Sequence, residues 1–292
     1  MQIVANGIGI EIDDQGLPGG EPLLLIMGLG MQLTGWPDEL VQRLVGKGFR
    51  VIRMDNRDAG LSQGFDQLGM PSMGLAALRY ALHMPVKAAY GIADMAADAV
   101  GVLDALGLQR AHICGASMGG MIAQHVAAKH PQRVKSLTLI MTTTGSRRLP
   151  QPGFKVRQAM ISRPDGRNPA AVVAHLERLL RVIGSPGYPP DPERQRQRLE
   201  ANVRRAWRPR GTARQLMAVI GDGDRSRLML QISAPTRVIH GEADPLVPVA
   251  AGRDLVQRIR DAVGDFVPGM GHDLPLQLMP HIAQGIAENA AR

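Results

Sequence analysis

Apolar and polar residues change their spacing several times along the chain, and each spacing predicts a different element. From Ile3 to Ile12 they alternate around an Asn6-Gly7 pair. Alternation around an Asn-Gly turn predicts a β-hairpin. Short, mostly apolar stretches that are predicted strands follow, and such stretches are typical of parallel strands that are buried on both faces. These runs lie at residues 23–26, 51–54, 111–114, 136–141, 236–239 and 262–267.

Helical spacing fills the intervals between several of these runs. Apolar residues recur every three or four positions from 92 to 106, stop at Gly107, and lead into the run at 111–114. Residues 37–47 and 118–130 are also expected to form helices. Because strands alternate with helices, we expect an α/β protein with a doubly wound, mostly parallel sheet.

The alternation breaks between Thr142 and about Leu230. Proline, arginine and glycine dominate this stretch, most strongly at 185–192 and 208–211, while 171–183 and 195–207 are predicted helices. The sequence therefore predicts one core, residues 1–143 and 229–292, interrupted by an inserted helical cap, residues 144–228. We refer to residues 144–228 as the cap segment.

The composition narrows the class of protein. With 292 residues and 45% hydrophobic residues, the chain is long enough to bury a substantial core. Its first residues have neither a basic start nor an apolar run, and no apolar stretch approaches the length of a membrane span, so we expect a cytoplasmic protein without a membrane span. The single cysteine, Cys114, excludes an intrachain disulfide and a multi-cysteine zinc site. We expect no metal, and the oligomeric state stays open.

The net charge of +8 is concentrated in one region. Between Ser146 and Leu230 there are 18 Lys and Arg against 7 Asp and Glu, whereas the rest of the chain is slightly acidic. No basic run interleaved with aromatic residues accompanies this charge, so we expect no nucleic-acid partner. A solvated, arginine-rich helical surface is the favoured interpretation, and a basic lid that attracts anionic substrates or surfaces is the alternative.

A candidate nucleophile lies between a predicted strand and a predicted helix. Residues 115–119 read Gly-Ala-Ser-Met-Gly and match the G-x-S-x-G pattern, in which the serine sits on a sharp turn and small neighbours avoid clashes. The pattern alone occurs readily by chance, but its strand–turn–helix setting is the one that the chemistry requires. The start of the helix also favours developing negative charge. We therefore expect Ser117 to be a catalytic nucleophile.

A serine nucleophile needs a base and an orienting carboxylate, which follow it here in the expected order. Asp244 follows the predicted strand at 236–239, and His272 follows the one at 262–267. Each is therefore expected where ligands bind, at the carboxyl end of the sheet. Three neighbours compete for these roles, and we consider them weaker candidates: His240, Glu242 and Asp273.

The tetrahedral intermediate needs two backbone donors. Met118, the residue after the nucleophile, is expected to supply one, and Leu29, in the loop after an early strand, is the candidate for the other. Glycine lets the backbone approach a substrate closely. Met27, Gly28 and Gly30 are accordingly expected to contact the substrate.

Five stretches stand in the order found in the α/β-hydrolase family: 25–28, 55–62, 115–119, 241–244 and 271–272. The chain resembles this family over nearly its whole length. Within the family it is most similar to the aclacinomycin methylesterase group of capped esterases, through 27–28, 35–38 and 55–62. The resemblance implies the α/β-hydrolase fold and esterase activity.

Two positions depart from the family pattern. The usual His-Gly after the early strand is Met27-Gly28 here, which keeps the backbone donor but removes a side chain that often braces the loop. The usual Arg-Gly in the stretch at 55–62 is Arg57-Asp58. Serine at position 117 argues against haloalkane dehalogenases and epoxide hydrolases, which carry an aspartate there.

The favoured hypothesis is a serine hydrolase that cleaves carboxylic esters of small molecules through an acyl-enzyme, without a cofactor. Methionine fills irregular apolar pockets, and its abundance near the expected site favours a hydrophobic substrate: Met27, Met31, Met118, Met121 and Met141. Carbon–carbon bond hydrolysis, lactonase and thioesterase chemistry by the same triad stay open. So does a ligand-binding protein that does not turn its ligand over.

Overall fold

The computed structural model describes residues 1–164 and 168–292, so residues 165–167 of the expected cap segment lie outside the described residues. Eight strands form one sheet: β1 (Gln2–Ala5), β2 (Ile8–Gln15), β3 (Glu21–Ile26), β4 (Phe49–Met54), β5 (Ala111–Ala116), β6 (Val134–Ile140), β7 (Thr236–Gly241) and β8 (Val263–Val267). Their order is β1-β2-β4-β3-β5-β6-β7-β8. The hairpin of β1 and β2 is antiparallel and pairs with β4, whereas every other pairing is parallel. The predicted doubly wound, mostly parallel sheet is confirmed.

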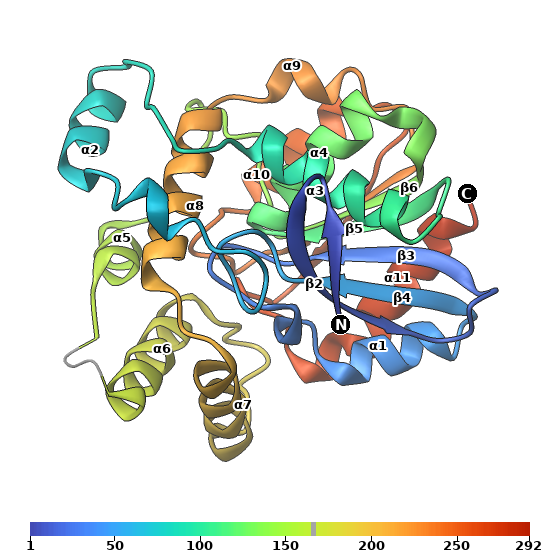
Figure 1. Ribbon diagram of the computed structural model, residues 1–292, viewed down its shortest axis with the longest axis horizontal. Coiled ribbons are helices and arrows are strands. Elements are labelled where there is room, and N and C mark those ends of the chain that lie inside the picture. The colour runs from blue at the N-terminus through green and yellow to red at the C-terminus, as the bar shows by residue number, and fades with distance from the viewer. Residues whose placement is uncertain (165–167) are drawn as a thin grey trace.

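Helices cover both faces of this sheet (Figure 1). One face carries α1 (Asp38–Val45) and α11 (Met279–Ala290), and the other carries α3 (Ile92–Ala105), α4 (Met118–Lys129) and α10 (Ala250–Arg258). Four short 3-10 helices connect elements, at Leu33–Gly35, Asp66–Leu68, Pro131–Arg133 and Leu276–Leu278. All six parallel strands carry a helix layer on at least one face, which matches their continuous apolar sequences.

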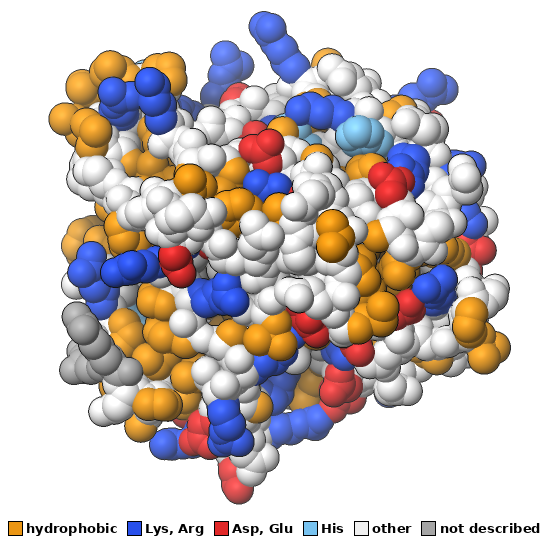
Figure 2. Space-filling view, viewed as in Figure 1, with side chains coloured by type: hydrophobic (Ala, Val, Ile, Leu, Met, Phe, Trp, Pro, Cys, Tyr) orange, Lys and Arg blue, Asp and Glu red, His pale blue; other side chains and the backbone are white. Residues whose placement is uncertain are grey.

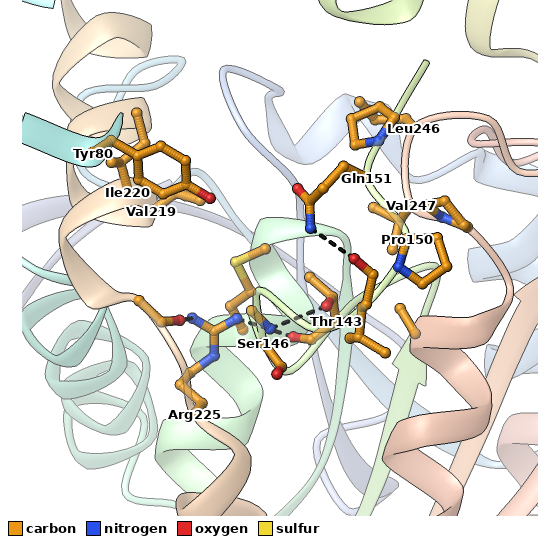
Figure 3. A pocket seen from close by; sticks show the side chains of 17 residues that line it. Tyr80, Thr143, Ser146, Pro150, Gln151, Val219, Ile220, Arg225, Leu246 and Val247 are labelled. Carbon is orange, nitrogen blue, oxygen red and sulfur yellow. Dashed lines mark hydrogen bonds between the residues drawn. The ribbon is translucent and has the colours of Figure 1, made fainter. Parts of the chain in front are cut away.

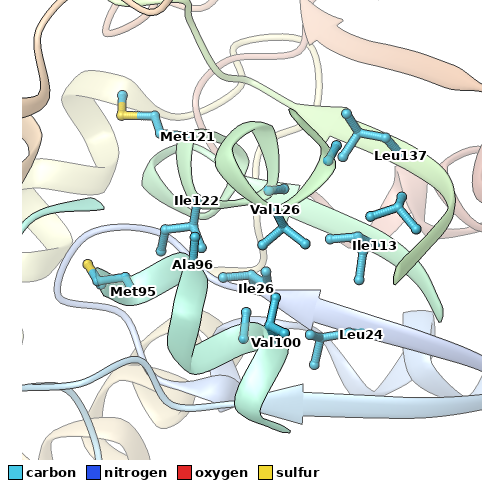
Figure 4. Packing of buried hydrophobic residues seen from close by; sticks show 14 of the residues in the cluster. Leu24, Ile26, Met95, Ala96, Val100, Ile113, Met121, Ile122, Val126 and Leu137 are labelled. Carbon is cyan, nitrogen blue, oxygen red and sulfur yellow. The ribbon is translucent and has the colours of Figure 1, made fainter. Parts of the chain in front are cut away.

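Strand β3 contributes alternate side chains to two hydrophobic clusters, one on each face of the sheet. Leu24 and Ile26 point toward α3 and α4, as Figure 4 shows, whereas Leu23 and Leu25 pack in the opposite cluster with α1 and α11. Alternate side chains of a strand point to opposite faces, so a strand covered on both sides needs apolar residues at successive positions.

Between β6 and β7, the described residues form five helices: α5 (Phe154–Ile161), α6 (Pro169–Ile183), α7 (Pro192–Arg205), α8 (Pro209–Asp222) and α9 (Ser226–Met229). The helices predicted at 171–183 and 195–207 correspond to α6 and α7. Each begins a few residues earlier than expected, because Asn168 and Asp191 cap it and a proline occupies its first turn.

Helix α8 was not predicted, because its first turn contains a proline and a glycine. Pro209 stands at the first helical position, where its missing N–H costs nothing. Gly211 is needed for close packing, since a Cβ atom there would lie 2.1 Å from the backbone oxygen of Asp58. The glycine that suggested a turn is therefore a packing contact between the cap segment and the core.

Helix α2 (Met73–Ala81) is a second unpredicted element. It lies between β4 and α3, is capped by Ser72, and buries only Ala76. Figure 1 shows it projecting from the molecule on the same side as α5. In the part of the chain that the structure describes, no helix is long and apolar enough to cross a membrane.

Candidate active site

Ser117 lies on a sharp turn between β5 and α4 and adopts φ 55° and ψ −119°, a conformation that is unusual for a residue with a side chain. The two glycines of the motif make this turn sterically feasible. A Cβ atom on Gly115 would lie 2.2 Å from the Gly119 oxygen, and one on Gly119 would lie 2.0 Å from the Ile26 oxygen. The turn leaves Ser117 partly exposed above the carboxyl end of the sheet.

Three side chains that are far apart in the sequence meet at this turn. His272 Nε2 lies 3.0 Å from Ser117 Oγ, and His272 Nδ1 lies 2.7 Å from Asp244 Oδ2. A carboxylate only accepts hydrogen bonds, so the neutral imidazole carries its proton on Nδ1. Nε2 is then left to accept the serine proton. This is the geometry of a nucleophile, a base and an orienting acid.

The second oxygen of Asp244 is held by the backbone. Asp244 Oδ1 accepts hydrogen bonds from the amides of Leu246 and Val247, at 2.9 and 2.8 Å. These bonds fix the carboxylate, which is itself buried. Asp244 therefore presents its other oxygen to His272 in one orientation.

The competing candidates have other partners, although His240 Nε2 lies 3.6 Å from Asp244 Oδ2. His240 Nε2 lies 2.8 Å from the Val247 oxygen, and burial lowers the pKa of His240. Glu242 lies at the surface, 3.7 Å from Arg253. Asp273 forms a short hydrogen bond with Ser185 of the cap segment, and burial raises its pKa although this bond lowers it. No hydrogen bond joins any of the three to Ser117 in the described residues.

The loop that carries His272 is tied to the cap segment at three points. The His272 amide donates to the Ile183 oxygen at 2.7 Å, and the Gly271 amide donates to Ser185 Oγ at 2.8 Å. The Gly187 amide donates to the Gly269 oxygen at 2.9 Å. The end of α6 and the residues after it thus hold the histidine loop, a role that sequence spacing did not reveal.

The loop after β3 lies against Ser117. A Cβ atom on Gly28 would lie 3.2 Å from the Ser117 Cβ atom, so the backbone approaches the serine as closely as glycine permits. Leu29 follows Gly28 and is half-buried, and Gly30 donates its amide to Gln215 of α8 at 2.8 Å. The side chain of Met27 is buried in the core cluster that contains Trp36.

Met118 is the first residue of α4. The first N–H groups of a helix have no acceptor within the helix, so the Met118 amide is available at the nucleophile. Its side chain is buried in the core with α3 and α4.

Two carboxylates after β4 hold cap arginines. Asp55 Oδ2 accepts from Arg205 at 2.8 Å, and Asp58 is paired with Arg214. Asp55 Oδ1 also accepts from the Leu33 amide at 2.6 Å, which ties the loop after β3 to the same carboxylate. Part of the basic charge of the cap segment is therefore neutralised inside the protein. Asp55 stands where the motif matches the family pattern, and Asp58 stands where it departs from that pattern.

A cavity of about 190 Å³ lies beside α4, and Ser117, Asp244 and His272 are not among the residues that line it (Figure 3). Met121, whose amide donates to the Ser117 oxygen, forms part of its wall. The remaining wall comes from α2, from the start of the cap segment, from α8 and from the loop after Asp244: Tyr80, Thr143, Gly145, Ser146, Leu149, Pro150, Gln151, Pro152, Val219, Ile220, Gly223, Arg225, Leu246, Val247, Pro248 and Ala251. Most of these groups are apolar.

The one buried arginine of this wall is already engaged. Arg225 donates to the Thr143 oxygen at 2.9 Å, to Gln124 at 3.0 Å and to Asp222 at 2.6 Å. Burial lowers the pKa of Arg225, which its pairing with Asp222 offsets in part. The cavity is thus suited to an apolar group rather than to an anion.

Comparisons with known proteins show the family to which the chain belongs. A family model described as the alpha/beta hydrolase fold matches residues 21–277. The chain belongs to the α/β-hydrolase fold family. Rhodomycin D methylesterase of Streptomyces sp. (strain C5) is 28% identical over 93% of this chain and 91% of its own length. The motif-based prediction of the family is confirmed.

One further relative and one solved structure are also similar to this chain. A 2-hydroxy-6-oxononadienedioate/2-hydroxy-6-oxononatrienedioate hydrolase of Burkholderia vietnamiensis is 30% identical over 90% of this α/β-hydrolase and 84% of its own length. Among solved structures, an esterase of Exiguobacterium antarcticum superposes with a TM-score of 0.77 at 20% identity, covering 100% of this chain and 99% of that one. That structure shows the shared fold.

The described residues contain no group of three or more His, Cys, Asp or Glu side chains that could hold a metal ion. Cys114 is fully buried in β5, and burial raises the pKa of its thiol.

Proposed function

We propose that this α/β-hydrolase cleaves carboxylic esters of small, hydrophobic molecules, with Ser117 as nucleophile, His272 as general base and acid, and Asp244 as the residue that orients His272. The observation that carries the proposal is the position of His272, within hydrogen-bond distance of both Ser117 and Asp244. The methylesterase named among the relatives supports the same reaction.

The reaction would proceed in two steps, acylation of Ser117 and hydrolysis of the acyl-enzyme. Ser117 Oγ attacks the ester carbonyl while its proton passes to His272 Nε2, giving a tetrahedral oxyanion. His272 then gives this proton to the departing alkoxide, the C–O bond breaks, and an acyl-enzyme and an alcohol result. Water, deprotonated by His272, attacks the acyl-enzyme in the same way and releases the acid, which restores Ser117.

We assign the oxyanion site to the amides of Met118 and Leu29. The first is supported by its place at the start of α4, and the second by the contact of Gly28 with Ser117. Met27, Gly28 and Gly30 would form the backbone wall along which the substrate approaches. These protein groups supply each proton transfer and charge contact of acyl transfer, so the proposal includes no cofactor.

We further propose that residues 144–228 act as a cap that selects the substrate, on a core formed by 1–143 and 229–292. Cap residues reach the nucleophile region through Gln215 and the histidine loop through Ser185. Together with the apolar cavity beside Met121, this placement favours a hydrophobic acyl or alkyl group.

A second candidate reaction is hydrolysis of a carbon–carbon bond by the same three side chains. The hydrolase of Burkholderia vietnamiensis, whose name indicates a 2-hydroxy-6-oxo dienoate substrate, supports it. Turnover of a vinylogous diketone without turnover of simple esters would favour this candidate over ester hydrolysis.

The test uses nitrophenyl esters of increasing acyl length together with a fluorophosphonate label. Wild type should hydrolyse at least one ester and become labelled, whereas Ser117→Ala should lose the label and lower kcat by roughly 10⁴-fold or more. Retained activity in Ser117→Ala would refute the mechanism. Failure of wild type in both assays would instead favour a protein that binds a ligand without turning it over.

A further inference from the structure

The outer side of α2 carries an apolar stripe. Leu75, Leu78 and Leu82 follow at intervals of three and four, which places them on one side of the helix, and they are 51%, 56% and 59% exposed. Met84 continues the stripe beyond the helix and is also exposed. The buried residue of the helix, Ala76, faces the protein. The apolar side of α2 therefore points away from the core, the reverse of a packed helix.

Helix α5 repeats this arrangement. Phe154 and Ile161 lie seven residues apart, two turns along one side of the helix, and each is 76% exposed. Val156 is the residue that this helix buries. A large aromatic and a branched aliphatic side chain are thus turned outward together.

The two helices belong to one side of the molecule, as Figure 1 shows. The guanidinium of Arg147, which precedes α5, stacks on the ring of Tyr80 of α2, 4.1 Å from its centre. Tyr80 and Pro152 also line the same cavity. We call the exposed apolar residues of these helices the α2–α5 face: Leu75, Leu78, Leu82, Met84, Phe154 and Ile161.

The charged residues in the two segments that carry this face all have one sign. The sequence has no Asp or Glu from 67 to 93 or from 134 to 164, the two segments that carry the face. It has several cations there with exposed or half-exposed side chains: Arg79, Lys87, Arg147, Arg148, Lys155, Arg157 and Arg163. Figure 2 shows hydrophobic and basic side chains side by side at the corner that α2 occupies. An apolar centre carried by segments whose charged residues are all basic is complementary to an anionic lipid surface.

We infer that the α2–α5 face docks this protein on the surface of an anionic lipid bilayer, with the leucines and Phe154 in the headgroup region and the cations on lipid phosphates. A second copy of the chain is a poorer occupant, because apposing two such faces would bring two sets of cations together without a carboxylate between them. A nucleic acid would use the cations but would leave the outward leucines unburied.

The test measures flotation of the full-length Ser117→Ala protein with vesicles, so that binding is read without any hydrolysis. One set of vesicles contains phosphatidylcholine alone, and the other an equimolar mixture of phosphatidylcholine and phosphatidylglycerol. The protein should float with the mixed vesicles, bind the neutral ones at least about tenfold more weakly, and detach as salt rises. Because the readout is flotation, its failure leaves the proposed ester hydrolysis unaffected.

Two variants with matched controls assign the binding to the face. The triple change Leu75→Ser, Leu78→Ser and Leu82→Ser should lower vesicle partitioning at least about tenfold, since exposed leucines contribute to interfacial binding and little to folding. Its control is Val4→Ser, Leu17→Ser and Leu230→Ser, at residues that are equally or more exposed on other elements.

The second variant tests the charges. Replacement of Lys87, Lys155 and Arg157 by Gln should weaken binding to the mixed vesicles by a similar factor, whereas Arg43→Gln with Arg260→Gln should leave it unchanged. Absence of binding to the mixed vesicles, or equal losses in both control proteins, would refute the proposal. A wild-type dimer in solution that the leucine changes convert to a monomer would also refute it and would identify a second copy as the occupant.

Discussion

The carboxylate of Asp58 and the guanidinium of Arg214 form a two-point ion pair, with both nitrogen–oxygen distances at 2.7 Å, although 156 residues separate them. Both side chains are almost completely buried. Asp58 adopts φ 66°, a left-handed conformation, at the position where the family pattern has glycine. Aspartate tolerates this conformation better than most residues, so the departure from the pattern gives the core an anchor for helix α8.

Asp58→Asn removes the charge of this anchor and keeps its shape. Removing one partner leaves a buried cation poorly compensated, so the free energy of unfolding at neutral pH should fall by about 3 kcal/mol. Urea denaturation measures this loss. The control is Asp66→Asn, because Asp66 contacts the same Arg214 but is exposed, and it should cost less than about 1 kcal/mol. Equal losses in the two variants would contradict the anchor.

The same pair predicts a pH dependence of stability. Burial by itself would raise the pKa of Asp58, but hydrogen bonds from Arg214, the Phe65 amide and Tyr90 outweigh it, and the pKa lies below its ordinary value. A lowered carboxylate pKa adds stability above the unfolded-state value of about 4, and this stability is lost as the pH falls through the folded-state value. Wild type should therefore lose more stability on acidification than Asp58→Asn, as urea titrations at several pH values would show.

Asp244→Asn tests the orientation of His272. The amide nitrogen of asparagine is a donor, so it favours the imidazole tautomer with its proton on Nε2, which no longer accepts a proton from Ser117. We expect kcat for the best ester to fall about 10⁴-fold. An unchanged thermal transition, with a loss of only tenfold or less, would show that another acid serves His272.

Ser185→Ala tests whether the cap segment positions the histidine loop. The change removes the acceptor for the Gly271 amide and the partner of Asp273, so His272 should be held less precisely. We expect kcat to fall about tenfold with little change in KM, because a small misplacement affects the transition state more than binding. Ser226→Ala, at an exposed cap hydroxyl bonded to Asp224, is the matched control and should leave both constants unchanged. A rise in KM alone would assign Ser185 to substrate binding.

Met121→Trp tests the cavity as the acyl or alkyl subsite. The larger side chain would fill part of this cavity, so kcat/KM for long-chain esters should fall at least about tenfold while that for acetate esters changes little. Leu17→Trp, at an exposed position between β2 and β3, controls for the effect of an added tryptophan. Equal losses for short and long esters would place the substrate elsewhere.

The sequence alone was sufficient to predict those parts of the structure that a local pattern of residues determines. Apolar runs bounded by turn residues predicted the buried strands, because a strand that is covered on both faces needs apolar residues at successive positions. The motif from Gly115 to Gly119 predicted the turn at Ser117. Its glycines avoid clashes with each other and with Ile26 at the end of the adjoining strand β3. Ser117, Asp244 and His272 were predicted as a set because each follows a strand and all parallel strands end at one edge.

Only the tertiary structure decided how the cap segment meets the core. The pairs Asp58–Arg214 and Ser185–Gly271 join residues that are distant in sequence and have no local periodicity. The outward orientation of the α2 leucines and the contact of Gly211 in α8 with Asp58 were likewise decided by the tertiary structure. Hydrophobic spacing records which residues share one side of an element, but it does not tell whether that side is buried or which distant residue packs beside it.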